Sequence, residues 1–164
     1  MSRAASPSHL AAAARAAGIG DERVLAAISA TPRAGFVPAD YVTAAYRDEP
    51  IPIGHRQVTT QPSLSARMIE GLHLDSGDRV LEIGTGPGFQ TALLARLAAR
   101  VISIERWPDL ADQARRNLAR AGPRQCGGAR RLFERSASGL ERRHVLALAR
   151  FVRLHGRYGF PSRP

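Results

Sequence analysis

The sequence predicts an α/β fold that contains a nucleotide-binding β-α-β unit. Residues 79–83, Arg-Val-Leu-Glu-Ile, are typical of a short buried strand, and a glycine turn, Gly-Thr-Gly-Pro-Gly, follows at 84–88. Glycines allow such a turn to bring backbone N–H groups close to a ligand. A second apolar strand over 100–105 ends in Glu105, 21 positions after Gly84. Because about 20 residues separate the turn from the ribose-binding acid in nucleotide-binding units, Glu105 is a candidate ribose ligand.

Two helices and a long connection are expected before this unit. A helix over 21–29 is favoured because Asp21 can accept N–H groups of the first turn, and Pro32 limits its extension. Residues 38–54 contain three prolines and a glycine, which favours a connection with at most one helical turn, around 41–46. Pro62 suits the first position of the next helix, where a missing N–H costs nothing. The predicted apolar stripe of that helix is Leu64, Met68, Ile69 and Leu72.

Two further helices flank the second strand. One is expected over 89–98, and the other over 108–121, where a proline starts the helix, acids occupy its first turn and Gly122 ends it. Their predicted buried faces are Phe89, Leu93 and Leu97 in the first and Leu110, Ala114 and Leu118 in the second. A strand, helix and strand in this order predict parallel pairing with a right-handed crossover.

Positive charge is concentrated near the C-terminus. The 164 residues include 24 basic residues, all of them arginine, against 14 acids, which gives a net charge of +10. Residues 1–121 hold 14 arginines and 12 acids, whereas residues 122–164 hold 10 arginines and 2 acids. Glycines and prolines interrupt the basic part, and no strand pattern is seen in it. We therefore expect residues 123–164 to be an atypical basic tail, either frame-shifted or disordered.

Composition also bears on the compartment and on metals. Cys126 is the single cysteine, which excludes a disulfide framework and favours a reducing, cytoplasmic compartment. No window approaches the roughly 20 apolar residues that cross a membrane, and Arg15 breaks the N-terminal alanine run, so no targeting segment is expected. The histidines lack metal-ligand spacing, so we expect no metal.

The spacing of the glycines limits the ligand of the turn. Gly-x-Gly-x-Gly at 84–88 differs from the Gly-x-Gly-x-x-Gly of dinucleotide enzymes. A P-loop is excluded because Gly-Lys-Ser/Thr does not occur. The remaining common ligand is S-adenosyl-L-methionine, whose methionine carboxylate can use the N–H groups of the turn while Glu105 takes the ribose hydroxyls.

Four segments occur in a recognisable order along the chain. They are Pro-Arg-Ala-Gly-Phe-Val-Pro (32–38), Gln-Val-Thr-Thr-Gln-Pro (57–62), Val-Leu-Glu-Ile-Gly-Thr-Gly-Pro-Gly-Phe-Gln-Thr-Ala (80–92) and Ser-Ile-Glu-Arg (103–106). Together they closely resemble bacterial protein-L-isoaspartate O-methyltransferases over about residues 18–122. The resemblance implies a Rossmann-like class I methyltransferase, here with an incomplete parallel sheet and a helical N-terminal extension.

Three regions follow from this resemblance. Residues 1–62 are expected to form the N-terminal helical extension and the acceptor-site segment, and residues 63–122 the core that binds S-adenosyl-L-methionine. The tail 123–164 is the third region. The family continues with further strands that cannot be read in this tail, and two strands alone leave a parallel sheet uncovered.

The resemblance implies transfer of a methyl group from S-adenosyl-L-methionine to the free carboxylate of an L-isoaspartyl residue in a damaged protein, a repair reaction. A carboxylate is already a nucleophile, so the enzyme mainly aligns the reactants and excludes water. The implied catalytic residue is Thr60, which stands where the family usually has Ser. The implied cofactor-binding residues are Glu82, Gly84, Gly86, Gly88 and Glu105. The implied partners are isoaspartyl-containing proteins or peptides. From composition and charge we expect no membrane partner, and a nucleic-acid partner is not favoured.

Several alternatives remain open from the sequence. The chain could be another small-molecule class I methyltransferase or a non-enzymatic basic binding protein. The tail could be a frame-shifted translation, which we favour, a genuine basic helix, or part of a folded but inactive remnant. Thr59 or Thr60 could merely cap the helix at Pro62, and Glu82 could be a solvated acid. Trp107 is expected to pack at the end of the second strand.

Overall fold

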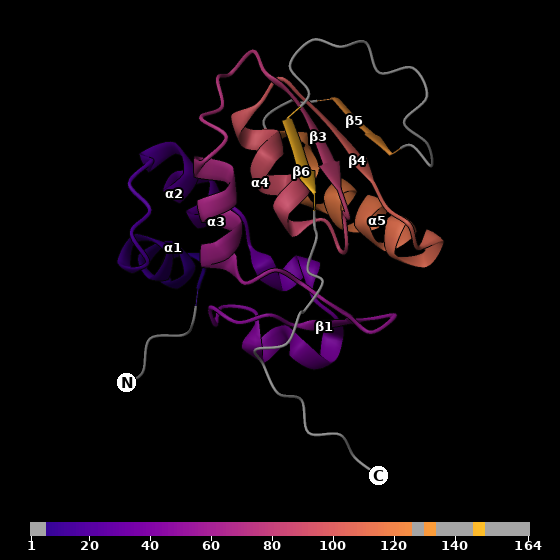
Figure 1. Cartoon of the computed structure of the whole chain (residues 1–164). Helices are drawn as coiled ribbons and strands as arrows, with labels where there is room; N and C mark the ends of the chain where they lie inside the picture. Colours follow the sequence, from indigo (N-terminus) through magenta and orange to yellow (C-terminus); the bar gives the residue numbers. More distant parts are fainter. Residues whose placement is uncertain (1–5, 126–129, 134–145, 150–164) are drawn as a thin grey trace.

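The structure is a computed structural model, and it describes residues 6–125, 130–133 and 146–149 (Figure 1). In chain order the elements are α1 (Pro7–Ala16), α2 (Glu22–Ser29), the 3-10 helices η1 (Arg33–Phe36) and η2 (Ala39–Ala44), β1 (Pro52–Gly54), β2 (Gln57–Val58), α3 (Pro62–Glu70), β3 (Arg79–Ile83), α4 (Phe89–Leu97), β4 (Arg100–Ile104), α5 (Pro108–Gln125), β5 (Arg130–Phe133) and β6 (Leu146–Ala149).

A parallel four-stranded sheet is the centre of the fold. Its strand order is β5-β4-β3-β6, and each neighbouring pair is parallel. The first strand of this sheet along the chain is β3, which lies in its middle. β4 and β5 follow on one side of β3, and β6 is then added on the other side. In open α/β sheets, ligands bind at the carboxyl ends of the strands where the order reverses. That position lies between β3 and β6, beside the glycine turn 84–88 that follows β3.

The predicted α/β class and both predicted strands are confirmed. β3 has the predicted bounds, and β4 ends one residue earlier than expected, so Glu105 follows the strand. The helix predicted over 21–29 is α2, with Asp21 as its N-cap accepting the N–H of Arg23 at 2.8 Å. The helix predicted at Pro62 is α3.

Three expectations were wrong in whole or in part. Leu64 is 46% exposed, because the buried side of α3 consists instead of smaller residues and Ile69. The connection 38–54 contains η2, in agreement with the helical turn expected there, but also the start of an unpredicted hairpin formed by β1 and β2. The tail contributes β5 and β6, although no strand pattern was predicted there. β5 is Arg-Arg-Leu-Phe, and its pairing uses backbone N–H and C=O groups that every non-proline residue carries, so the two arginines do not prevent it. β6 is the apolar run Leu-Ala-Leu-Ala, which is too short for its pattern to distinguish a strand from a helix.

The α5 helix is interrupted where its end was expected. Gly122 has φ 71° and ψ 157°, which is not helical, and the helical segment resumes to Gln125. α1, in contrast, was not predicted as a separate element. Its capping box uses His9, whose Nδ1 accepts the N–H of Ser6 at 3.0 Å. Glutamate or glutamine usually fills this position, so the sequence signal was easy to miss.

One hydrophobic core joins the N-terminal helices to the sheet. Its members come from α1, α2, α3, α4, α5, β3 and β4, and the most enclosed include Leu10, Ile28, Ile69, Leu93, Leu94, Val101 and Leu118. α4 and α5 therefore pack on the same face of the sheet, with α2 against α4, and with α1 and α3 packed against α2 (Figure 1). None of the helices in the described part of the chain is long and apolar enough to cross a membrane.

The first testable prediction concerns Gly88, which has φ 97° and whose Cβ would lie 3.2 Å from Leu118 Cγ. We expect Gly88→Ala to lower the free energy of unfolding by about 2–4 kcal/mol, since left-handed backbone and crowding both act. Gly18→Ala has the same positive φ without crowding and should cost about 1–2 kcal/mol. Gly77→Ala has neither feature and is the control. Denaturant unfolding of the full chain measures the series, and equal losses at all three positions would contradict the packing assignment.

Candidate functional site

The glycine turn and Glu105 meet at the carboxyl ends of β3 and β4. The parallel register pairs Ile83 with Ile104, and the Gly84 N–H donates to the Ile104 carbonyl at 2.7 Å. Two residues on, the Gly86 N–H donates to Glu105 Oε2 at 2.7 Å. The acid that the sequence analysis placed beside the turn therefore contacts it directly.

The Glu105 carboxylate accepts three backbone hydrogen bonds. Besides the Gly86 N–H, its Oε1 accepts the N–H of Arg106 at 2.8 Å and that of Trp107 at 3.1 Å. The Gly88 N–H donates to the Thr85 carbonyl at 3.1 Å. The N–H groups of all three turn glycines are thus bonded within the protein. A ligand at this turn must share these groups or displace the carboxylate, which differs from the open set of donors expected from the sequence.

Glu82 is fully enclosed, so the alternative of a solvated acid is excluded. It is 0% exposed, and its Oε2 accepts hydrogen bonds from Thr91 Oγ1 at 2.5 Å and Ser103 Oγ at 2.7 Å. Its Oε1 accepts a hydrogen bond from Gln90 Nε2 at 3.2 Å. These partners come from α4 and β4. Glu82, which lies on β3, therefore links α4 to both central strands through hydrogen bonds. A buried carboxylate needs such donors because leaving it unpaired is costly.

Thr59 and Thr60 lie just before α3, but neither is its N-cap. Gln61 is the N-cap and makes no capping hydrogen bond through its side chain. Thr60 is half-buried. Thr59 is buried, and its Oγ1 accepts the Ile51 N–H at 2.9 Å and a hydrogen bond from Arg33 Nη2 at 2.8 Å.

An internal carboxylate binds the N-terminus of α3. Asp48 Oδ1 accepts the Ser63 N–H at 2.8 Å, and Asp48 Oδ2 accepts a hydrogen bond from Gln61 Nε2 at 2.9 Å. Helix N-termini favour anions because their N–H groups are unpaired and the helix dipole is positive there. Asp48 was not predicted from the sequence, since it is 15 residues away from Ser63 and only the tertiary structure brings them together.

Arg33 is a fully buried cation beside this segment. Its Nη1 donates to the Ala45 and Arg47 carbonyls at 3.3 and 3.0 Å, and its Nη2 donates to the Glu49 carbonyl at 2.9 Å. Burial lowers the pKa of Arg33 to about 10, against an opposing effect of the Asp48 charge. The side chain is still cationic at neutral pH. Its burial therefore costs folding free energy there, and the cost is relieved only above about pH 10.

The tip of the β1–β2 hairpin contacts the start of α5. The His55 ring stacks on Trp107 with centroids 4.0 Å apart and planes 8° apart, and His55 Nε2 lies 2.8 Å from Asp109 Oδ2. The hydrogen bond from His55 lowers the pKa of Asp109. Trp107 packs at the end of β4 as expected, but its histidine partner was not predicted. The hairpin is thereby held next to Glu105, two residues before Trp107.

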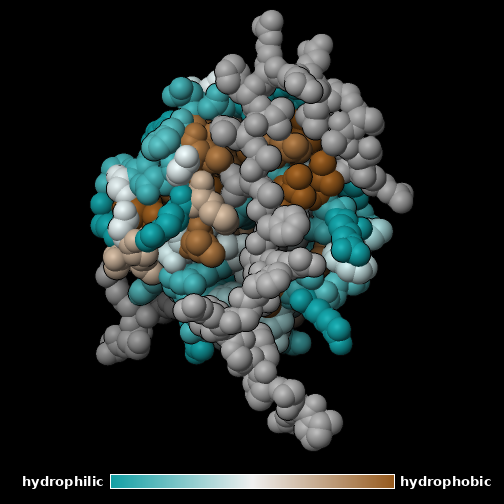
Figure 2. Space-filling model, viewed as in Figure 1, coloured by the Kyte–Doolittle hydropathy of each residue, from teal (hydrophilic) through white to brown (hydrophobic). Residues whose placement is uncertain are grey.

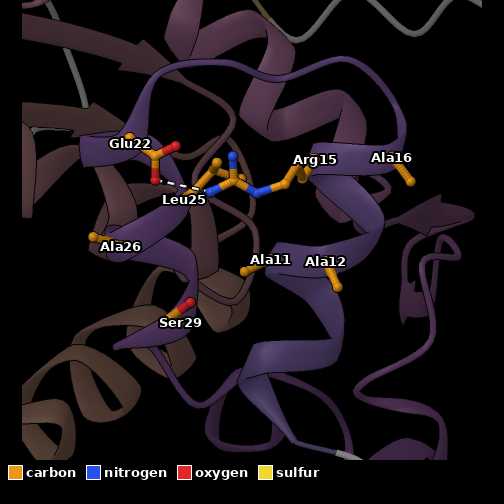
Figure 3. A pocket seen from close by; sticks show the side chains of 8 residues that line it. All are labelled: Ala11, Ala12, Arg15, Ala16, Glu22, Leu25, Ala26 and Ser29. Carbon is orange, nitrogen blue, oxygen red and sulfur yellow. Dashed lines mark hydrogen bonds and ion pairs between the residues drawn. The ribbon is translucent and has the colours of Figure 1, made fainter.

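A groove between α1 and α2 lies away from these residues. Ala11, Leu25 and Ser29 are among the residues that line it, and Arg15 reaches across to Glu22 with a 2.8 Å ion pair (Figure 3). It contains none of the residues that the sequence analysis assigned to the site. Within residues 6–125 and the two short strands beyond, no cluster of His, Cys, Asp or Glu could hold a metal ion.

A second prediction concerns the Glu82 network. We expect Thr91→Val to lower the free energy of unfolding by about 1–3 kcal/mol, because a nearly isosteric change removes a donor from a buried carboxylate. Thr43→Val makes the same change at an exposed position of η2 and should alter stability by about 0.5 kcal/mol or less. Denaturant unfolding measures both variants. Similar losses of unfolding free energy in the two variants would show that the hydrogen bond from the Thr91 hydroxyl does not stabilise the fold.

The comparisons with known proteins agree with this geometry. The family model of protein-L-isoaspartate(D-aspartate) O-methyltransferase matches residues 5–162. A protein-L-isoaspartate O-methyltransferase of Methanoculleus marisnigri is 61% identical over 108 residues, which cover 66% of this chain and 49% of that protein. One of Methanoregula boonei is 54% identical over 105 residues, covering 64% and 48%. The chain thus spans about half the length of these curated relatives.

Solved structures give the same result at the level of the fold. A protein-L-isoaspartate O-methyltransferase superposes with a TM-score of 0.63 at 28% identity, over 78% of this chain and 41% of its own. A related protein from Plasmodium falciparum, in complex with S-adenosyl-L-homocysteine, gives a TM-score of 0.66 at 22% identity, over 80% and 63%. The second likeness concerns the fold alone. With the family model matching nearly the whole length, this chain belongs to the protein-L-isoaspartate(D-aspartate) O-methyltransferase family.

Proposed function

We propose that this chain binds S-adenosyl-L-methionine at the carboxyl ends of β3 and β4 and that its activity is methylation of L-isoaspartyl carboxylates in damaged proteins. The observation that carries the proposal is the Glu105 carboxylate hydrogen-bonded to Gly86 in the turn after β3. It brings the acid after β4 and the glycine turn after β3 together at the carboxyl edge of the sheet, where β3 also borders the reversal of strand order. Family membership supports the same reaction, and the single cysteine favours a cytoplasmic setting.

The residues present fit the cofactor. Glu105 is half-buried, and its carboxylate can accept hydrogen bonds from ribose hydroxyls while it remains close to the turn. Gly84 and Gly86 have φ values of 89° and 52°, and such a turn lets a ligand approach its backbone closely. Glu82 contributes indirectly, by holding α4 and β4 together beneath the turn. The cofactor supplies an electrophilic methyl group, and the protein supplies its orientation.

The acceptor is proposed to meet Thr60. An isoaspartyl carboxylate needs no general base, so the task of the protein is to orient one of its oxygens and exclude water. The Thr60 hydroxyl can donate a hydrogen bond to that carboxylate. The N–H of Ser63 is already bonded to Asp48, so the acceptor is not expected at this group. Threonine keeps the hydroxyl of the serine usual in the family but has a more restricted first side-chain torsion.

A third prediction tests the cofactor site. Glu105→Gln should weaken binding of S-adenosyl-L-homocysteine about 10- to 100-fold, because hydrogen bonds to a charged acceptor contribute about 1.5–3 kcal/mol. Glu22→Gln is the matched control, since Glu22 is exposed and lies on α2, away from the turn. Isothermal titration calorimetry measures both. Equal affinity of Glu105→Gln and the unaltered chain would exclude Glu105 as a ribose ligand.

A fourth prediction tests the acceptor site. Thr60→Ala should lower kcat/KM for an isoaspartyl peptide about 10- to 100-fold through loss of one hydrogen bond to an anion, with unchanged affinity for S-adenosyl-L-homocysteine. Thr60→Ser should retain the activity. Transfer of radiolabelled methyl to matched isoaspartyl and aspartyl peptides is the measurement. Cofactor binding without preference for the isoaspartyl peptide would point to another methyltransferase activity, and absence of cofactor binding would refute the enzymatic proposal.

A further inference from the structure

Arg33 carries a charge that the folded chain does not pair with a carboxylate. It is 0% exposed, and none of the ion pairs found among the described residues includes it. Its hydrogen bonds go instead to three backbone carbonyls and one hydroxyl. Burial of a cation without a carboxylate is costly, and the four oxygens offset that cost only while they stay in place around the guanidinium. The arrangement therefore couples the charge of Arg33 to the positions of these oxygens.

The contacts of Arg33 fix the chain on both sides of Thr60. Before it, Arg33 Nη2 donates to Thr59 Oγ1 at 2.8 Å, and the Thr59 N–H donates to the Ile51 carbonyl at 2.7 Å. After Thr60, Arg33 acts on the chain indirectly, by way of Asp48. Arg33 binds the carbonyls of the residues before and after Asp48, whose carboxylate accepts the Ser63 N–H.

Arg33 also contacts the helix that follows the glycine turn. Its guanidinium carbon lies 5.8 Å from the centroid of the Phe89 ring, within the range of cation–π interactions. Phe36, at the end of η1, packs edge-on against the same ring at 5.9 Å. Phe89 is the first residue of α4 and directly follows Gly88. One side chain thus touches both the segment before α3 and the element that begins at the glycine turn.

We propose that Arg33 is a positioning residue that holds Thr60 in register with the glycine turn. The proposal rests on the proposed function, since Thr60 matters only if it meets the acceptor. A planar guanidinium is suited to this role because its rigid fork of donors can satisfy several acceptors at fixed angles. Lysine at this position has one nitrogen and cannot reach the same four oxygens together. A displacement of about 1 Å between reacting groups can cost about 100-fold in rate.

The test compares Arg33→Lys with Arg96→Lys in the full chain. Arg96 is a matched control, because it also binds a threonine hydroxyl and a backbone carbonyl, those of Thr31 and Ala30. Arg33→Lys should lower kcat for the isoaspartyl peptide about 100-fold and change the affinity for S-adenosyl-L-homocysteine less than about threefold. Arg96→Lys should leave both unchanged. Ethylguanidinium added to Arg33→Ala should restore part of the activity in a saturable manner, as a merely destabilised protein would not.

Hydrogen exchange separates this inference from the proposed function. Arg33→Lys should speed exchange of the Ile51, Thr59 and Ser63 amides at least tenfold. The Ala111 amide of α5, which donates to the Trp107 carbonyl, should stay protected and so report an intact fold. If the unaltered chain lacks activity but these three amides respond, the proposed function fails and the positioning of the segment stands. Unchanged exchange, or wild-type kcat in Arg33→Lys, would overturn the inference.

Discussion

The parallel pairing of β3 with β4 is the constraint on which the candidate site depends. Because Ile83 pairs with Ile104, the chain leaves both strands at the same level. The Gly84 N–H can then bond to the Ile104 carbonyl, and Glu105 can reach Gly86. A shift of the register by one residue would turn every side chain to the other face of the sheet. It would also separate the acid from the turn, although the sequence motifs would be unchanged.

Two buried polar side chains attach other elements to this strand pair. Glu82 binds α4 and β4 from within the sheet, and Arg33 binds the segment before α3 and lies over the Phe89 ring. Each is hydrogen-bonded to donors or acceptors from several parts of the chain, although Arg33 Nε is buried without a partner. Buried polar networks of this kind favour one arrangement of the surrounding segments, because other arrangements leave more polar groups unpaired in a medium of low dielectric constant. Both side chains act near the start of α4, where Arg33 lies over the Phe89 ring and Glu82 binds Gln90 and Thr91.

Features that depend on residues close together in the chain could be predicted from the sequence, whereas contacts between residues far apart in the chain could not. β3, β4, α2 and the interruption at Gly122 follow from local apolar patterns, caps and glycine. The proximity of Glu105 to the turn follows from a spacing that β-α-β geometry imposes. The bond from Asp48 to Ser63 and the stacking of His55 on Trp107 join residues far apart in the chain, so no local pattern reports them. The hairpin tip was also hidden, because its positive φ angles occur at His55 and Arg56 rather than at the usual Asn-Gly.

The two faces of the sheet differ in their packing, and this difference bears on whether cofactor binding can be measured separately from methyl transfer. Glu82 and Ser103 face α4, so alternation along the strands turns Leu81 and Ile102 to the other side. Leu81 and Ile102 are buried, yet they belong to neither hydrophobic cluster among the described residues. Figure 2 likewise shows hydrophobic side chains at the surface beside the sheet. The contacts of the glycine turn, Glu82 and Glu105 come from β3, β4, α4, α5 and the residues just after β4, and α4 and α5 cover the well-packed face. Cofactor affinity should therefore be governed by this half of the fold, and it can be measured independently of methyl transfer.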